Sequence, residues 1–172
     1  PRLHVFCAES QARRRRSLLD RGYRAVRESY LMRIDLPGEA GEPAPLPAGI
    51  DLRPFVPGRD DASVYAADEE AFADHFLFES STLAQWRLHT VEHPAFDPSL
   101  WLVAWADDEV VGEALTFLDE YEAYVDSLAV RRRWRGRGLG FALLTSAFAL
   151  ARQHGRPKLR LGVDAQNSTG AL

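Results

Sequence analysis

The sequence predicts an α/β fold, and two patterns carry that prediction. Apolar runs of strand length, several of them alternating with polar residues, lie at 50–57, 100–106, 110–117, 121–130 and 158–167. Apolar residues at helical spacing lie between these runs, at about 60–74, 81–91 and 138–154. The resulting order of strand, two helices, three strands, helix and strand is typical of an α/β arrangement.

A shorter unit, residues 1–36, precedes this series. Its predicted elements are a strand at 3–10, a helix at 10–22 and a strand at 23–36. Ser10 is the candidate N-cap of the helix and Gly22 its C-terminal glycine. Residues 37–49 follow and are rich in Pro, Gly and Ala with acidic spacers, which is the composition of an extended linker. We therefore place a boundary at 37–49.

The elements of the second unit are bounded by turn residues. The first strand is expected at a sheet edge, ending at Pro57. The next three strands are separated by Asp107–Glu109 and Asp119–Glu120, which predicts an antiparallel meander. The long helix after them ends at Gly155, and one more strand follows.

The two ends of the chain share a layout. Residues 159–172 resemble residues 3–16 in the order strand, acidic residue and polar entry into a helix. This indicates an internal repeat, with 1–36 as the tail of a preceding copy and 50–172 as a second copy cut short at its C-terminus. The first residue is Pro1 and not Met, which favours a fragment.

Composition restricts the class of protein. The chain has 172 residues, 46% hydrophobic and 27% charged, which is enough for one sizeable core. A net charge of -4 disfavours a dedicated nucleic-acid binder, so Arg131–Arg133 are either a solvated basic turn or part of an RNA-binding module. A single cysteine, Cys7, and the lack of a signal peptide or a membrane-length apolar run favour a reducing cytoplasm.

The stretch VRRRWRGRGLGFALL, residues 130–144, is the most specific motif. It is not a Walker-type phosphate loop, because Phe141 and Ala142 stand where Lys and Ser or Thr are required. It is not a dinucleotide fingerprint either, because Phe141 or Leu143 replaces the last glycine. What remains is a three-glycine turn between a strand and a long helix.

Such a turn can bind an anion through its main chain. Gly136, Gly138 and Gly140 lack a Cβ, so backbone N–H groups can approach a ligand closely, and the helix N-terminus adds partial positive charge. Arg135 and Arg137 can supply paired donors to phosphate oxygens. The motif therefore predicts a pyrophosphate site at a strand-to-helix junction.

The same residues resemble a known family. Arg135, Gly138 and Gly140 match the pattern Arg-x-x-Gly-x-Gly, preceded by Leu-Ala-Val at 128–130, and this resembles the acetyl-CoA motif of the GNAT superfamily of N-acyltransferases. Residues 50–172 follow that family's order of elements, although Arg132 stands where a proline is usual. The resemblance implies a mixed, mostly antiparallel central sheet with helices on both faces. It also implies that the strands AYVDSLAV and LRLGVD splay apart at the acetyl-CoA site.

The resemblance further implies acetyl-CoA as co-substrate and no metal. The main chain at 128–130 would pair with the pantetheine arm like an added strand and steady the oxyanion, and the turn at 135–140 would hold the pyrophosphate. The implied cofactor-binding residues are Leu128, Ala129, Val130, Arg135, Gly136, Arg137, Gly138, Leu139, Gly140 and Asn167.

An N-acetyltransferase also needs a base, since an ammonium acceptor must lose a proton before it attacks. Glu122 is the first candidate and Asp126 the second, because strand alternation places both on one face with Tyr124. In the family, the acid is commonly a tyrosine on the helix after Asn167, and that position would lie past the end of this chain. His75 lies where the family's first helices line the acceptor site, although a lone histidine beside aromatics is more often a packing residue.

The family resemblance extends to residues 1–36. They look like the end of a preceding domain in a tandem GNAT protein of the mycothiol synthase kind, and this segment could also complete the sheet of the second unit. The expected partner is a small-molecule amine, with neither nucleic acid nor membrane, and a homodimer or a pairing with a second GNAT-like domain stays open. The alternative function is a regulatory module that binds acyl-CoA without catalysis.

Overall fold

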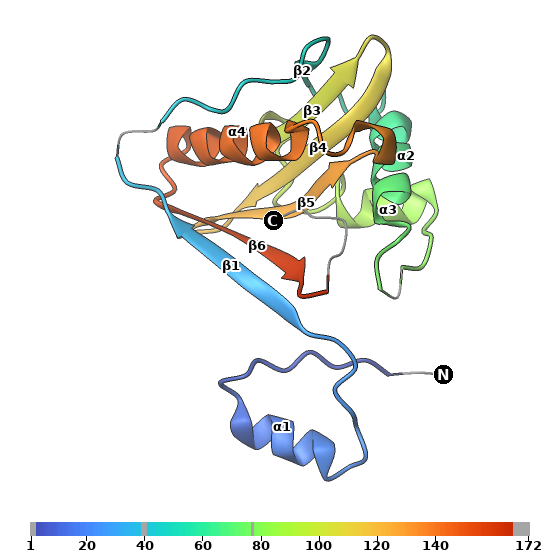
Figure 1. Ribbon diagram of the computed structural model, residues 1–172, viewed down its shortest axis with the longest axis vertical. Coiled ribbons are helices and arrows are strands. Elements are labelled where there is room, and N and C mark those ends of the chain that lie inside the picture. Colours follow the sequence, from blue (N-terminus) through green and yellow to red (C-terminus); the bar gives the residue numbers. More distant parts are fainter. Residues whose placement is uncertain (1–2, 39–40, 77, 167–172) are drawn as a thin grey trace.

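The computed structural model describes residues 3–38, 41–76 and 78–166, and its centre is a six-stranded mixed sheet (Figure 1). The strands follow one another in the order β1-β6-β5-β4-β3-β2, and every neighbouring pair is antiparallel except β5–β6. The strands are β1 Ser29–Asp35, β2 Asp51–Pro54, β3 Trp101–Ala106, β4 Glu109–Leu118, β5 Ala123–Val130 and β6 Lys158–Asp164. The helices are α1 Ala12–Leu19, α2 Asp61–Phe72, α3 Leu83–His89 and α4 Leu139–Gln153, with short 3-10 turns at Pro98–Leu100 and Arg132–Trp134.

Helices cover both faces of the sheet, as predicted, because α2, α3 and α4 bury apolar residues against it. On one face, α4 packs Leu139, Leu143 and Ala147 against the sheet. On the other face, α2 and α3 place Val64 and Trp86 in a second core, which also contains aromatic residues of the sheet. The meander of β3, β4 and β5 joins the two cores.

Gly112 of β4 is the point where α4 comes closest to the sheet. A Cβ at this position would lie 2.9 Å from the Ala129 carbonyl oxygen and 3.2 Å from methyl carbons of both Leu139 and Leu143. Glycine therefore lets the first two turns of α4 settle directly on the sheet. This contact fixes the start of the helix, where the glycine-rich turn lies.

The N-terminal unit differs in part from the prediction. Residues 3–8 form no strand, because they have no neighbouring strand to pair with. The expected helix is present as α1, and Gly22 after it has a φ of 83°, the left-handed conformation that favours glycine. In Figure 1, α1 lies apart from the sheet and β1 leads back to it.

The strand predicted at 23–36 is shorter, and it joins the main sheet. β1 pairs along its whole length with β6, from Ser29 opposite Asp164 to Asp35 opposite Lys158. The linker residue Ala44 donates its N–H to Thr145 Oγ1 on α4 at 2.9 Å. The N-terminal unit therefore supplies the edge strand of the sheet, and its connection runs against α4.

The other predicted elements are confirmed with small shifts. β2 is an edge strand but ends at Pro54 and not at Pro57, and β6 ends at Asp164. α4 begins at Leu139, directly after the predicted turn. The long periodic segments were thus predicted to within a few residues.

Candidate functional site

The parallel strands β5 and β6 separate halfway along β5. Their pairing covers only Ala123, Tyr124 and Val125. At the same point the β4–β5 register shifts, because Thr116 pairs with Val125 and Leu115 with Ser127, so Asp126 is the extra residue of a bulge. The splayed strand pair expected from the sequence is therefore present, and the bulge marks where the gap opens.

The main chain of β5 beyond the bulge faces this gap at alternate residues. The Arg131 N–H donates to the Val111 carbonyl of β4 at 3.0 Å. Because successive N–H groups point to opposite sides of a strand, those of Leu128 and Val130 point away from β4 and toward the gap. Ala129 points the other way, and its carbonyl oxygen lies beside Gly112. Two of the three predicted backbone contacts are thus directed to the gap, and the one at Ala129 is not.

The turn before α4 is set by two glycines. Gly136 and Gly138 have φ of 71° and 85°, and Gly138 is the N-cap of the helix. Gly140 has no positive φ, and a Cβ there would only touch Val130 at 3.7 Å. The fold itself therefore requires glycine at 136 and 138 but leaves free space at 140.

The N–H groups of this turn are available to a ligand. Across the described parts of the chain, the backbone N–H groups of residues 136–141 have no hydrogen-bond partner, and no side chain caps α4. Six consecutive donors at a helix N-terminus are an arrangement that can bind an anion. This is the local structure that the sequence predicted for the three-glycine turn.

The two arginines of the turn differ in their contacts. Arg135 donates from Nε to the Val130 carbonyl at 3.0 Å and from a terminal nitrogen to the Ala71 carbonyl at 2.8 Å, so it ties β5 and α2 to the turn. Arg137 is exposed and stacks over the Trp134 ring, with its guanidinium carbon 4.8 Å from the ring centre. Arg137 is the better placed of the two to reach a phosphate.

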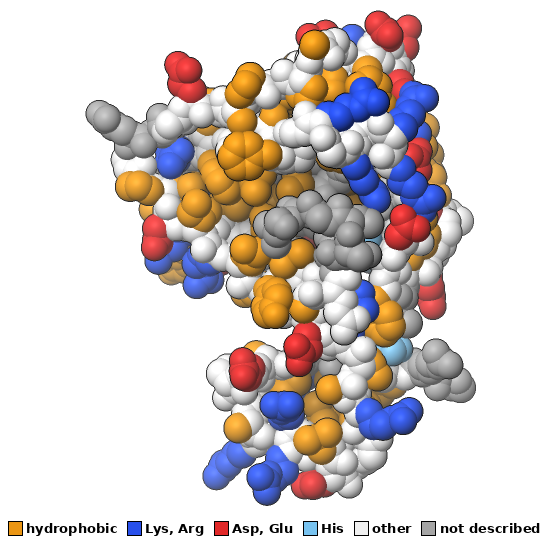
Figure 2. Space-filling model, in the orientation of Figure 1, with side chains coloured by type: hydrophobic (Ala, Val, Ile, Leu, Met, Phe, Trp, Pro, Cys, Tyr) orange, Lys and Arg blue, Asp and Glu red, His pale blue; other side chains and the backbone are white. Residues whose placement is uncertain are grey.

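Arg131–Arg133 are paired with acidic side chains. Arg131 lies 2.7 Å from Glu70 of α2, Arg132 lies 2.7 Å from Asp74, and Arg133 pairs with Glu109 of β4. Figure 2 shows Lys and Arg side chains gathered at the upper right with acidic side chains beside them. Arg132 and Arg133 are exposed, as expected of a solvated basic turn, whereas Arg131 is largely buried, and the acidic partners of all three disfavour an RNA-binding surface.

The first candidate base, Glu122, is committed to two arginines. Its carboxylate lies 2.8 Å from Arg33 of β1 and 2.6 Å from Arg160 of β6, and the residue is only 9% exposed. Both oxygens of the carboxylate thus lie within ion-pair distance of a guanidinium, so Glu122 is less available to a substrate than an unpaired acid. Glu122 therefore has a structural role, because its two ion pairs join the start of β5 to β6 and to β1.

The second candidate, Asp126, is open to solvent at the bulge. Desolvation by surrounding protein atoms raises its pKa, while the Tyr124 hydroxyl and the charges of His93 and His89 offset part of that rise. These neighbours place Asp126 on the α3 side of the sheet. The Tyr124 hydroxyl faces Asp126, and the Arg160 guanidinium that pairs with Glu122 lies 4.5 Å from the centre of the Tyr124 ring, so the three side chains share one face as predicted.

His75 lies in the loop after α2. Its ring packs edge-on against Phe72 at 4.4 Å between centres. Burial lowers its pKa, and the charges of Asp164 and Arg135 act on it in opposite directions. His75 is therefore a packing residue near Asp164, the last residue of β6.

A buried acidic cluster was not predicted. Glu113 of β4 and Asp68 of α2 both lie within hydrogen-bond distance of the Ser127 hydroxyl on β5. A glutamate in the middle of the central strand, within an otherwise apolar and aromatic segment, was the available signal. Asn167, the remaining predicted cofactor residue, lies outside the described residues.

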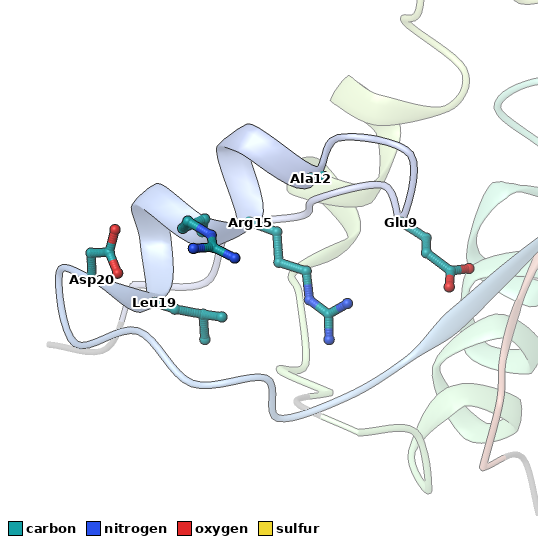
Figure 3. Close-up of a pocket in the computed structure, with 6 residues that line it drawn as sticks. Glu9, Ala12, Arg15, Leu19 and Asp20 are labelled. Carbon is teal, nitrogen blue, oxygen red and sulfur yellow. The ribbon is translucent and has the colours of Figure 1, made fainter.

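Other features lie away from the gap. A hollow of about 410 Å³ next to α1 is lined by Glu9, Ala12, Arg15, Arg16, Leu19 and Asp20. Figure 3 shows Arg15 and Leu19 extending from α1 toward the segment that leads to β1. Within residues 3–38, 41–76 and 78–166, no helix is long and apolar enough to cross a bilayer. The same ranges contain no group of three His, Cys, Asp or Glu side chains arranged for a metal ion.

The fold and this gap together define a GNAT-type acyltransferase domain. The profile described as the acetyltransferase (GNAT) family matches residues 62–171, so the chain belongs to that family. It is 38% identical over 150 residues to a mycothiol acetyltransferase of Streptomyces avermitilis, across 85% of this chain and 48% of that protein. The chain spans about half the length of the curated relatives it matches.

Solved structures agree with this assignment. A GCN5-related N-acetyltransferase from Sphaerobacter thermophilus has a TM-score of 0.80 and 36% identity, covering 95% of this chain and 51% of that one. The PaiA N-acetyltransferase of Thermoplasma acidophilum, solved with coenzyme A, has a TM-score of 0.53 and 19% identity, covering 70% of this chain and 83% of that one. The second likeness concerns the fold alone.

Proposed function

We propose that this chain catalyses transfer of an acetyl group from acetyl-CoA to a primary amine of a small molecule, by direct attack on the thioester. The observation that carries the proposal is the gap between β5 and β6. It opens at the Asp126 bulge and leads directly to the free N–H groups of residues 136–141. Main-chain donors for an extended arm and for a pyrophosphate therefore lie end to end.

The residues present fit acetyl-CoA. Leu128 and Val130 would pair with the pantetheine arm, residues 136–141 would donate to the pyrophosphate, and Arg137 would add a charged contact. Gly140 supports the same fit, since its missing side chain leaves space that the fold itself does not need. When bound, this co-substrate supplies the activated acetyl thioester.

Asp126 is our proposed base, ahead of Glu122. It is open to solvent at the mouth of the gap, whereas Glu122 is held by Arg33 and Arg160. The Asp126 carboxylate would accept the proton that an ammonium acceptor must lose, directly or through water. A C–N bond then replaces the C–S bond, CoA leaves as a thiolate that takes up the second proton lost by the amine nitrogen, and the Leu128 N–H would steady the oxygen that gains negative charge.

The acceptor is proposed to be a small cationic amine. The relatives are named mycothiol acetyltransferases, which makes a cysteinyl-sugar amine the first acceptor to test and an aminoglycoside-like amine the second. The exposed acids Glu120 and Asp126 would attract such a cation.

We also propose that residues 1–36 complete the sheet of the 50–172 unit, with 37–49 as the connection. β1 covers the outer edge of β6, and Arg33 of β1 holds Glu122 at the start of β5. The N-terminal unit would thus support the strand that borders the gap.

Thiol release from acetyl-CoA across a panel of amines tests the function. We expect turnover with a primary amine, and a loss of turnover with retained acetyl-CoA binding in Asp126→Asn. Asp108→Asn is the matched control, because Asp108 is an exposed acid in the turn between β3 and β4, away from the bulge. Acetyl-CoA binding without turnover of any amine would instead support the regulatory alternative.

A further inference from the structure

A second group of titratable side chains lies beneath the gap, on the side of the sheet that α2 covers. The Ser127 hydroxyl oxygen lies 2.9 Å from Asp68 Oδ1 and 3.2 Å from Glu113 Oε1. The Trp86 indole N–H donates to the other Asp68 oxygen at 3.1 Å. Three elements, α2, β4 and β5, therefore meet at one hydroxyl.

Glu113 is the most deeply buried member of this group. It has no solvent exposure, and its Oε2 has no hydrogen-bond partner among the described residues. The surrounding core is apolar and aromatic, including Val64 and Leu115. An ionised carboxylate in such a place is strongly unfavourable unless it is paired.

The hydrogen count at Ser127 decides the charge of the group. A hydroxyl carries one hydrogen, so it can donate to Asp68 or to Glu113 but not to both. The other contact is a hydrogen bond only if a carboxyl group donates to the hydroxyl oxygen. Two hydrogen bonds at Ser127 thus imply one proton on the carboxyl pair, and the direct hydrogen bond between Asp68 and Glu113 implies the same.

The charged side chains around Asp68 and Glu113 also favour one proton on these two carboxyl groups. Arg131 is the cation that acts on Glu113, and it is already paired with Glu70 and lies 3.7 Å from Glu109. Glu69 adds a negative charge near Asp68. Burial and the neighbouring Asp68 raise the pKa of Glu113 well above its usual range.

We propose that Glu113, Ser127 and Asp68 form a proton-sharing triad that positions β5 at the bulge, so that the acetyl-CoA gap keeps its shape only while the triad holds one proton. Ser127 directly follows Asp126 and precedes Leu128, so its anchoring to α2 fixes the strand that borders the gap. Loss of the proton would leave two negative charges around one hydroxyl and drive α2 and β5 apart. The part of this proposal that concerns acetyl-CoA rests on the proposed function.

The first experiment measures the proton by its linkage to folding. The folded chain keeps a proton that the unfolded chain releases above about pH 4.3. The ratio of folded to unfolded protein should therefore fall as the pH rises, by about tenfold per pH unit for one proton. This fall should be seen in the wild type and not in Glu113→Gln. Glu120→Gln is the control and should follow the wild type. Parallel pH curves for wild type and Glu113→Gln would overturn the proposal.

An infrared measurement needs no variant and covers the case in which Glu113→Gln does not fold. The wild type at pH 7 should show the carbonyl stretch of a protonated carboxyl group, which is separate from the carboxylate bands. A spectrum without that band would refute the triad.

The second experiment tests positioning by acetyl-CoA titration at pH 6 and pH 9. Wild type should lose affinity at the higher pH by about tenfold, while Glu113→Gln, whose amide cannot ionise, should keep it. Equal loss in both proteins would overturn the positioning role. If neither protein binds acetyl-CoA at pH 6, the proposed function fails, and the proton linkage still decides whether the triad exists.

Discussion

Replacing Gly112 with alanine tests how closely α4 must approach the sheet. The new methyl group would lie 2.9 Å from the Ala129 carbonyl oxygen and 3.2 Å from Leu139 and Leu143, and the carbonyl belongs to a central strand that cannot rotate away. Overpacking of this kind costs about 1–3 kcal/mol. At ~2–4 °C per kcal/mol for a domain of this size, the melting temperature should fall by about 2–12 °C.

Gly162→Ala is the matched control, since Gly162 lies in β6 with nothing within 4 Å of the added methyl group and no positive φ. Urea unfolding followed by tryptophan fluorescence suits both variants, because Trp86 and Trp101 are buried. Equal unfolding free energies for the two variants would refute the close-approach argument. A loss of acetyl-CoA affinity in Gly112→Ala but not in Gly162→Ala would further show that the position of α4 on the sheet affects the glycine-rich turn.

Three further predictions follow from the site. Arg135→Ala should lower stability by about 1–3 kcal/mol, because two partly buried carbonyl groups lose a charged donor. Arg137→Ala should spare stability and weaken acetyl-CoA binding. Calorimetry separates the two effects, and a reversed pattern would contradict them. The acetylation rate should fall as the pH drops through the raised pKa of Asp126, because only the carboxylate form accepts a proton. If the dependence of the rate on pH is the same in Asp126→Asn, Asp126 is not the base. Deleting residues 1–36 should lower the melting temperature of the remaining chain, because β6 loses its pairing with β1 and Glu122 loses its ion pair with Arg33. An unchanged melting temperature would show that the unit 50–172 is stable without them.

The sequence predicted the elements whose signal is local and long. α4 has five buried apolar residues at helical spacing and a glycine before it, so its position was evident. The strand predicted at 3–10 failed for the opposite reason, because an apolar run alone does not show whether a partner strand exists. The glycine-rich turn was predictable because glycine at 136 and 138 reflects a local backbone conformation.

The site chemistry depends on contacts between distant positions, and these were less visible. Glu122 seemed a free carboxylate because Arg33, its partner, lies 89 positions away in the sequence. The bulge at Asp126 was not predicted, because it depends on how β5 pairs with β4. Glu113 was overlooked because only the fold brings α2 and β5 around it.

Calorimetric titration of acetyl-CoA into wild type and Gly140→Asp tests the central claim most directly. The substitution should leave the fold intact, since a side chain at 140 meets only ordinary contact with Val130 and an acidic residue in the first turn favours a helix. Its carboxylate would occupy the anion site formed by residues 136–141. We predict binding by wild type and a loss of about tenfold or more in affinity for Gly140→Asp. Equal binding by both proteins, or no binding by wild type, would contradict the account.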